Sequence, residues 1–170
     1  MSRRFDDPIL LRLWDHWQSV RAGRAAPHVD DISMAALGSS AEHTMVIERV
    51  GPRWRYLSVG DAIRRIYFYP MERLYLDAVV PQNLLARAVE RYARVCDSGR
   101  PALTRNGYEI TAGLGFAVQR LILPLAREDG SIGGVICGQV MQKAPDRTAD
   151  HQPPDQFEFL DSEKPPSAAT

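Results

Sequence analysis

The chain opens with apolar residues that recur at the spacing of one helix face. In the stretch DDPILLRLWDHWQSVRAGRAAP, these residues are Leu10, Leu13, Trp14 and Trp17. Asp7 is a good N-cap and Pro8 suits the first helical position, whereas Gly23 is a typical stop signal. The pattern predicts an amphipathic helix that begins at Pro8 and ends near Gly23.

Runs of β-forming residues follow and predict a sheet of about five strands. The expected strands are 44–50, 53–59, 102–111, 116–126 and 131–141. Gly51-Pro52 joins the first pair in an antiparallel hairpin, and Asp129-Gly130 is a strong hairpin signal between the last two strands. Prolines break 61–80 into short helical pieces, whereas 84–97 keeps one apolar helical face and predicts the long helix.

The last two expected strands are nearly continuous apolar runs, FAVQRLILPLA and SIGGVICGQVM. An antiparallel strand with one face in water should alternate instead, so we expect both faces of the sheet to be covered. The short helices of 61–80 can cover one face. The other face is left for the tryptophan helix or for a second subunit.

Length and charge exclude several classes of protein. A chain of 170 residues, 45% of them hydrophobic, is long enough for one domain with a sizeable core. Lysine plus arginine equals aspartate plus glutamate, 21 each, so no overall field favours binding to nucleic acid or to an anionic membrane. Because we find no signal peptide and no apolar run of membrane-spanning length, we expect a cytoplasmic protein.

The two ends of the chain are expected to lie outside the domain, which we place at 10–142. Residues 1–9 form an N-terminal arm. Residues 143–170 are acidic and rich in proline, which predicts a disordered tail. Within this tail, DQFEFLDSEK carries three apolar residues in acidic surroundings, which is typical of a solvated linker or of a segment that folds onto a partner.

No catalytic or metal-binding arrangement is found in the sequence, so we expect neither enzymatic activity nor a metal site. The histidines lie on a helix, in two loops and in the tail, without ligand spacing. Cys96 and Cys137 sit far apart in regular segments and are expected to be buried thiols, with a redox-sensing role for Cys137 as the alternative.

Several motifs give the chain a family resemblance. They are W-x-x-W-x-x-x-R-x-G-R-x-x-P from Trp14 to Pro27, SGRP from Ser98 to Pro101, and RLILPLAREDG from Arg120 to Gly130. Together with the order of two strands, short helices, a long helix and three strands, they resemble the PAS-like family of alphaproteobacteria called PAS_5 or DUF1457. The resemblance covers most of the chain. Tyr67 and Glu72 stand where members of that family usually carry two glycines.

The resemblance implies an α+β, PAS-like fold: a five-stranded antiparallel sheet with helices over one face, preceded here by the amphipathic helix. It also implies a regulatory role in bacterial sensing or signalling, without catalytic residues. Haem is disfavoured because 84–97 contains no histidine to act as an axial ligand. A flavin photoadduct is disfavoured because Cys96 lies near the end of that helix, whereas photosensory PAS domains place their cysteine before it.

Two hypotheses about function follow from these features. In the first, the domain forms a homodimer and acts on an unidentified signalling protein. The interface candidates are Leu10, Leu13, Trp14 and Trp17; packing of the same residues on their own sheet is an equal alternative. In the second, a small molecule binds between the long helix and the sheet. The ligand-pocket candidates are Tyr67, Phe68, Leu85, Leu121 and Ile136, although the aromatic pair can also fill the cavity itself.

Overall fold

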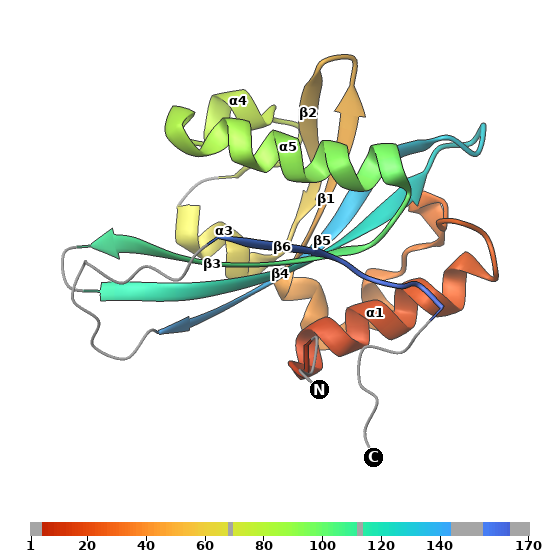
Figure 1. Cartoon of the computed structure of the whole chain (residues 1–170), viewed down its shortest axis with the longest axis horizontal. Helices are drawn as coiled ribbons and strands as arrows, with labels where there is room; N and C mark the ends of the chain where they lie inside the picture. The colour runs from red at the N-terminus through yellow and green to blue at the C-terminus, as the bar shows by residue number, and fades with distance from the viewer. Residues whose placement is uncertain (1–4, 68–69, 112–113, 144–154, 164–170) are drawn as a thin grey trace.

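The structure is a computed structural model that describes residues 5–67, 70–111, 114–143 and 155–163. It has an α+β fold in which helices cover both faces of one antiparallel six-stranded sheet (Figure 1). The helices are α1 (Pro8–Arg21), η1 (Val29–Asp31), α2 (Met34–Leu37), η2 (Gly38–His43), α3 (Asp61–Tyr67), α4 (Leu76–Val79) and α5 (Gln82–Ser98). The strands are β1 (Thr44–Val50), β2 (Arg53–Val59), β3 (Ala102–Thr111), β4 (Leu114–Ala126), β5 (Ile132–Lys143) and β6 (Gln156–Phe159).

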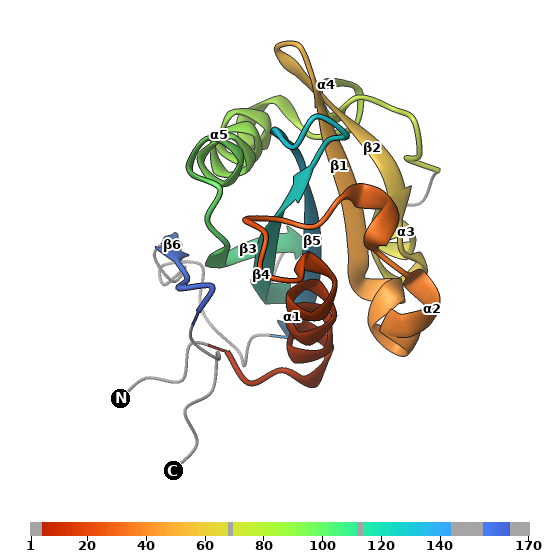
Figure 2. The same cartoon turned by 90° about the vertical axis from the view of Figure 1, so that its right-hand side faces the viewer.

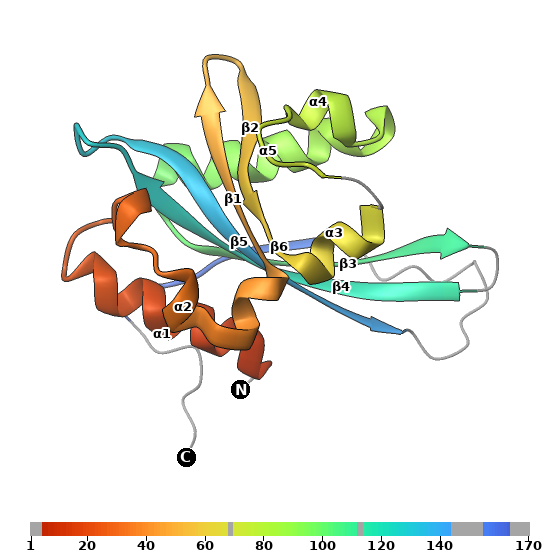
Figure 3. The ribbon, with the colours of Figure 1, turned by 180° about the vertical axis from the view of Figure 1, so that it is seen from behind.

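The strands lie in the order β2-β1-β5-β4-β3-β6. The predicted β1–β2 hairpin is confirmed, with Val50 opposite Arg53, and Figure 3 shows it from behind. The β4–β5 hairpin is also confirmed: Gly130 takes a φ of 83°, and the Asp129 carboxylate accepts from the backbone and the hydroxyl of Ser131. The apolar runs β4 and β5 lie at the centre of the sheet and contribute side chains to a core on each face, which explains why neither alternates.

The tryptophan helix, α1, covers one face of the sheet. Asp7 caps it by accepting from the Ile9 N–H at 2.9 Å, and Pro8 is its first residue as predicted. A glycine lets the helix approach β5, because a Cβ at Gly138 would lie only 2.7 Å from Leu13 Cδ2. The core on this side combines the apolar stripe of α1 with side chains of β4 and β5.

The long helix α5 covers the opposite face, together with α3 and α4 (Figure 2). Its buried residues Tyr92, Val95 and Cys96 share a hydrophobic core with Ile122 of β4 and Cys137 of β5. The helix predicted at 84–97 is thus confirmed, with one extra residue at its C-terminal end and two at its start. The prediction that both faces are covered is confirmed as well.

The C-terminal segment corrects the expected domain bounds. We expected disorder throughout 143–170, yet 156–159 forms β6 and pairs with 102–105 of β3. Leu160 continues into the core beneath α1, where it is 2% exposed. The sheet therefore has a sixth strand that the composition did not indicate, because the few apolar residues that hold it lie among acidic residues and prolines. Residues 144–154 and 164–170 lie outside the described part of the chain.

The expected N-terminal arm also contributes to the fold. Phe5 is 2% exposed, and its ring lies edge-on to the ring of Trp14 with 6.1 Å between their centroids. Phe5 therefore belongs to the same core as α1. The folded unit extends from Phe5 to the end of the described C-terminal segment rather than from 10 to 142.

Candidate functional site

A row of polar side chains crosses three strands on the face of the sheet that α5 covers. Thr104 of β3 pairs with Arg120 of β4, which in turn pairs with Gln139 of β5. The adjacent row consists of Ala102, Ile122 and Cys137, all in the core beneath α5. Because residues two apart along a strand point to the same face, Thr104, Arg120 and Gln139 also point toward α5. We call these three residues the polar row.

Arg120 stands at the centre of the polar row and is held by neutral oxygens. Its Nε donates to Gln139 Oε1 at 2.8 Å, and a terminal nitrogen donates to Asn106 Oδ1 at 3.0 Å. Within the described residues, no carboxylate makes an ion pair with this guanidinium. Arg120 therefore brings a positive charge into a half-buried position, with further N–H groups available to an anion.

The neighbours of Arg120 each leave a buried polar atom without a partner. Gln139 is 2% exposed and Thr104 is 0% exposed. Neither Gln139 Nε2 nor Thr104 Oγ1 has a hydrogen-bond partner among the described residues. Leaving such a group unpaired costs about 1–3 kcal/mol, so these two atoms flank the guanidinium at an energetic cost.

A second arginine reaches toward the polar row from above. Arg91 of α5 is 8% exposed and pairs with Asp155, which also lies 3.3 Å from Arg87 Nε. Burial lowers the pKa of Arg91; the Asp155 carboxylate opposes this shift, and the positive charge of Arg120 adds to it. The guanidiniums of Arg87 and Arg91 thus share one carboxylate here.

This arrangement has the features of an anion-binding site. Arg120, Gln139 and Thr104 present N–H and O–H donors side by side, and charge-assisted hydrogen bonds to such donors are stronger than neutral ones. The low dielectric under α5 strengthens each of these bonds further. What the site offers chemically is recognition of an oxyanion by positioned donors and positive charge.

The cysteines near this face are buried thiols, as predicted. Burial raises the pKa of Cys137 to about 12 and that of Cys96 to about 11. The Cys96 thiol donates to the Gly134 carbonyl oxygen at 3.5 Å. Both side chains are therefore protonated at neutral pH, when a thiol is a poor nucleophile.

The predicted pocket residues are not brought together. Leu121 and Ile136 belong to the core beneath α1, whereas Leu85 packs against the core beneath α5 on the other side of the sheet. The side chain of Tyr67 and the whole of Phe68 lie outside the described part of the structure. The prediction for the two strand residues was wrong because successive side chains of a strand point to opposite faces. Leu121 and Ile136 are each next to a residue that faces α5, namely Ile122 and Cys137.

The predicted interface residues lie in the core of a single chain. Leu10, Leu13 and Trp17 are 0% exposed, and Trp14 is 2% exposed. Side chains with so little free surface cannot form the contact of a dimer. The alternative, that the helix packs on its own sheet, is what the structure shows.

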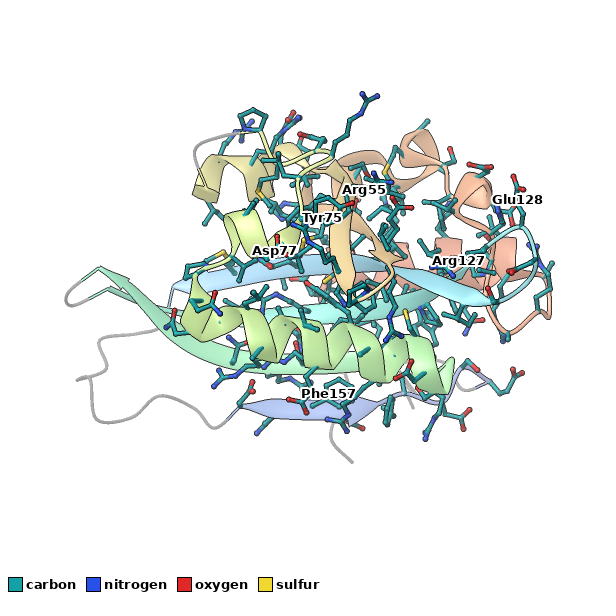
Figure 4. All side chains as sticks on the ribbon, turned by 90° about the horizontal axis from the view of Figure 1, so that it is seen from above. Arg55, Tyr75, Asp77, Arg127, Glu128 and Phe157 are labelled. Carbon is teal, nitrogen blue, oxygen red and sulfur yellow. The ribbon has the colours of Figure 1, made fainter. Side chains whose placement is uncertain are left out.

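Another arginine-rich cluster lies at the β2 edge and is already paired (Figure 4). Arg53 stacks 3.7 Å from the ring centroid of Tyr75 and makes two hydrogen bonds, of 2.7 and 2.6 Å, to Asp77. Arg55 pairs with Glu48. Trp54 points the other way and is 2% exposed, because successive side chains of a strand point to opposite faces.

Sequence reasoning missed the polar row although a signal was present. Arg120 and Gln139 interrupt apolar runs that otherwise predict fully buried strands. Arg91 lies close to the helical face of Tyr92 and Val95 and is buried with them. Polar residues inside buried strands are the informative exceptions to hydrophobic patterning. Thr104 could not have been identified in this way, because threonine is a common strand residue.

Comparison with known families and proteins gives no further guide to this site. No family model matches the chain, and no curated protein matches it. Across 5–67, 70–111, 114–143 and 155–163, no three His, Cys, Asp or Glu side chains group as metal ligands. Within the same ranges, no helix is long and apolar enough to cross a membrane.

Proposed function

We propose that the chain is a non-catalytic, PAS-like regulatory domain of the cytoplasm that binds a small oxyanion at the polar row and acts on another protein. The order of its elements supports the PAS-like assignment: two strands, short helices, one long helix and three strands precede β6. The family motifs of the sequence support it too. The long helix and the sheet enclose the polar row, where a sensory domain of this class would hold its ligand.

One observation carries the ligand half of this proposal. Gln139 Nε2 and Thr104 Oγ1 are buried and unpaired on either side of Arg120, whose charge meets no carboxylate in the described chain. An oxyanion placed against these three groups would pair all of them at once. Its binding would recover the cost of both unpaired atoms as affinity.

A purely structural role for the row is less favourable on physical grounds. Buried charged networks contribute to stability only when every member is satisfied, and apolar residues of similar volume are often as stable or more stable. The row has two unsatisfied members, and its neighbouring row is apolar. A domain selected only for stability would extend that apolar row.

The proposal is tested by native mass spectrometry of the gently purified full-length protein, followed by calorimetric titration with inorganic phosphate and with succinate. We expect either a retained anionic small molecule or binding of one of the two probes. The variant Gln139→Leu removes one unpaired donor, and Arg120→Gln removes the charge. Each should weaken binding by about tenfold or more, the usual effect of deleting a charge-assisted hydrogen bond.

The matched control is Arg65→Ala, which removes an exposed arginine of α3 far from the row in sequence. It should leave binding unchanged. If a folded wild-type protein retains nothing and binds neither probe, and Gln139→Leu only raises stability, the row is structural and the ligand half of the proposal is wrong. The same mass spectrum reports the number of subunits. We keep the homodimer as a prediction, through a surface other than α1.

A further inference from the structure

The tail segment, residues 155–163, bridges the two helical layers around the edge of β3. In Figures 1 and 2, β6 lies at that edge, between α5 on one side and α1 on the other. Four residues of β6 pair with β3, from Gln156 opposite Arg105 to Phe159 opposite Ala102. The Leu160 N–H then donates to the Pro101 carbonyl oxygen at 2.8 Å.

On the α5 side, arginines receive the aromatic residues of the tail segment. Arg94 lies 3.8 Å from the ring centroid of Phe157, and Arg100 lies 4.8 Å from that of Phe159. The two rings contact each other edge to face, with centroids 5.0 Å apart. Figure 4 shows Phe157 beside α5. Asp155, just before the strand, pairs with Arg91 and Arg87.

On the α1 side, a further arginine holds the end of the tail segment. A terminal nitrogen of Arg21 donates to the Ser162 carbonyl oxygen at 3.2 Å and pairs with Glu163 at 2.9 Å. Gln18 Nε2 donates to the same carbonyl at 2.5 Å. The edge of β3 is thus surrounded by guanidiniums, and the tail segment supplies carboxylates and aromatic rings to match them.

The tail segment is the least anchored strand of the sheet. Its ladder has four residue pairs, whereas the β4–β5 ladder runs from Phe116–Lys143 to Ala126–Ile132. Phe157 and Phe159 are only half-buried. Short edge strands with exposed contacts open at a lower free energy than the strands inside a sheet, so this strand can leave while the rest of the domain stays folded.

We propose that the β3 edge is a docking site for a partner protein, and that the tail segment occupies it in the partner's absence. The partner would add an extended strand to β3, as in other cases of β-strand addition. Its chemistry follows from the present occupant: an acidic residue, then aromatic residues two and four positions later, as in Asp155, Phe157 and Phe159. This surface adjoins the polar row, because Thr104 lies opposite Phe157, but peptide binding and anion binding are measured separately, so either proposal can fail without the other.

Charge and side-chain direction identify the chemistry of the occupant. Alternate residues of an added strand face α5. There the guanidiniums of Arg94 and Arg100 stack on aromatic rings, which they favour over aliphatic side chains. The cations at both ends favour a segment with carboxylates before and after the strand. A nucleic acid would supply negative charge but could not pair with the β3 backbone.

The test uses a fluorescently labelled peptide with the sequence of residues 155–163 and the full-length protein. Phe157→Ser with Phe159→Ser in the protein weakens the tail segment without altering the β3 edge. We expect this double variant to bind the peptide in an anisotropy titration. The wild-type protein should bind the peptide at least about tenfold more weakly than the double variant does, because its own tethered tail competes at millimolar effective concentration.

Two controls give the experiment its specificity. A peptide with serine in place of both phenylalanines should not bind. Adding Arg94→Ala to the double variant should weaken binding by about fivefold, the range of an exposed cation–π contact, whereas adding Arg65→Ala should not. Circular dichroism checks that each variant is folded, and the single variant Phe157→Ser replaces the double one if the latter is not.

Three results would overturn the proposal. A folded double variant that does not bind the peptide would show that β6 is a fixed part of the sheet. Equal binding of the wild type and the double variant would place the peptide elsewhere. A wild-type dimer that is lost in the double variant would show that the occupant is a second copy of this chain.

Discussion

The indole Nε1 of Trp17 donates a hydrogen bond to the carbonyl oxygen of Pro124 at 2.9 Å, with the ring fully buried. Trp17 belongs to the motif that runs from Trp14 to Pro27, and Pro124 belongs to the motif that runs from Arg120 to Gly130. Although they are 107 residues apart in sequence, the two motifs meet at this bond. They are thus two halves of one structural contact, by which α1 is fixed on β4.

Trp17→Phe should destabilise the fold more than Trp14→Phe. Both changes shrink a buried ring, but only the first leaves the Pro124 carbonyl without its donor. An unpaired buried carbonyl costs about 1–3 kcal/mol, so we expect a difference of about that size in the free energy of unfolding, measured by urea titration. Equal losses in the two variants would mean that the bond contributes nothing beyond packing.

Gly138→Ala should separate α1 from β5. The added Cβ would lie 2.7 Å from Leu13 Cδ2 and 3.0 Å from Leu10 Cδ2, so one side must shift. Overpacking of this kind costs about 1–3 kcal/mol, which a thermal unfolding curve will show as a lower Tm. Gly130→Asn is the matched control, because Gly130 has open space around it and asparagine tolerates its φ of 83°. A control that loses as much stability as Gly138→Ala would contradict the steric explanation.

Much of the fold could be predicted because local signals agreed with tertiary packing. For the β1–β2 hairpin and for the start of α1 at Pro8, the hydrophobic pattern and a cap or turn residue predicted the same element, and no other element fitted the sequence. The face assignments of Leu121 and Ile136 failed for a different reason. Ile136 has buried neighbours on both sides, and buried Ile122 follows Leu121, so these apolar runs have no alternation from which to tell one face from the other.

The sequence marks Arg120 and Gln139 as exceptions in apolar runs, but it does not show that they lie side by side or that β6 pairs with β3. Arg120 and Gln139 are 19 residues apart, and only the β4–β5 register sets them side by side. The tail segment is held by arginines from α1 and α5, none of which is near it in sequence. Pairing between distant segments is a tertiary property, which local composition does not encode.

Acid should weaken the contact between α1 and the segment before α2. The Ser33 N–H donates to His16 Nε2 at 3.0 Å, which requires a neutral ring, and burial lowers the pKa of His16 below 6.5. The contribution is therefore fully present above pH 6.5 and is lost as the pH falls through the lower folded pKa. Between pH 7.5 and 5, the wild type should lose more stability than His16→Gln, by less than about 1 kcal/mol because the ring is only half-buried. Parallel pH profiles of the two proteins would contradict this account.

The thiols should not react in the folded protein. Burial raises the pKa of Cys96 to about 11 and that of Cys137 to about 12, so neither forms a thiolate at pH 8. A colorimetric disulfide reagent should label almost nothing in buffer and both cysteines in urea. Rapid labelling of Cys137 in buffer would instead support the redox-sensing alternative, and Cys137→Ala would show which thiol had reacted.

Asp155→Asn should be costly, whereas Asp97→Asn should cost little. Both substitutions break an aspartate–arginine pair, but the side chain of Arg91 is 10% exposed and that of Arg49 is 38% exposed. Removing the carboxylate from a buried guanidinium leaves its desolvation uncompensated, with a penalty of about 1–3 kcal/mol. An exposed pair contributes about 0–1 kcal/mol. Urea titration at low and at high salt measures both, and salt should reduce only the small effect of Asp97→Asn.

The comparison also decides what holds the tail segment at the β3 edge. If Asp155→Asn lowers stability and increases hydrogen exchange in 156–159 together, the Arg91 pair anchors β6 to α5. If neither changes more than in Asp97→Asn, the aromatic rings stacked on Arg94 and Arg100 hold the strand by themselves. The first result is expected. Breaking the pair leaves the buried Arg91 guanidinium with its full desolvation penalty, whereas the rings of Phe157 and Phe159 are only half-buried and contribute less.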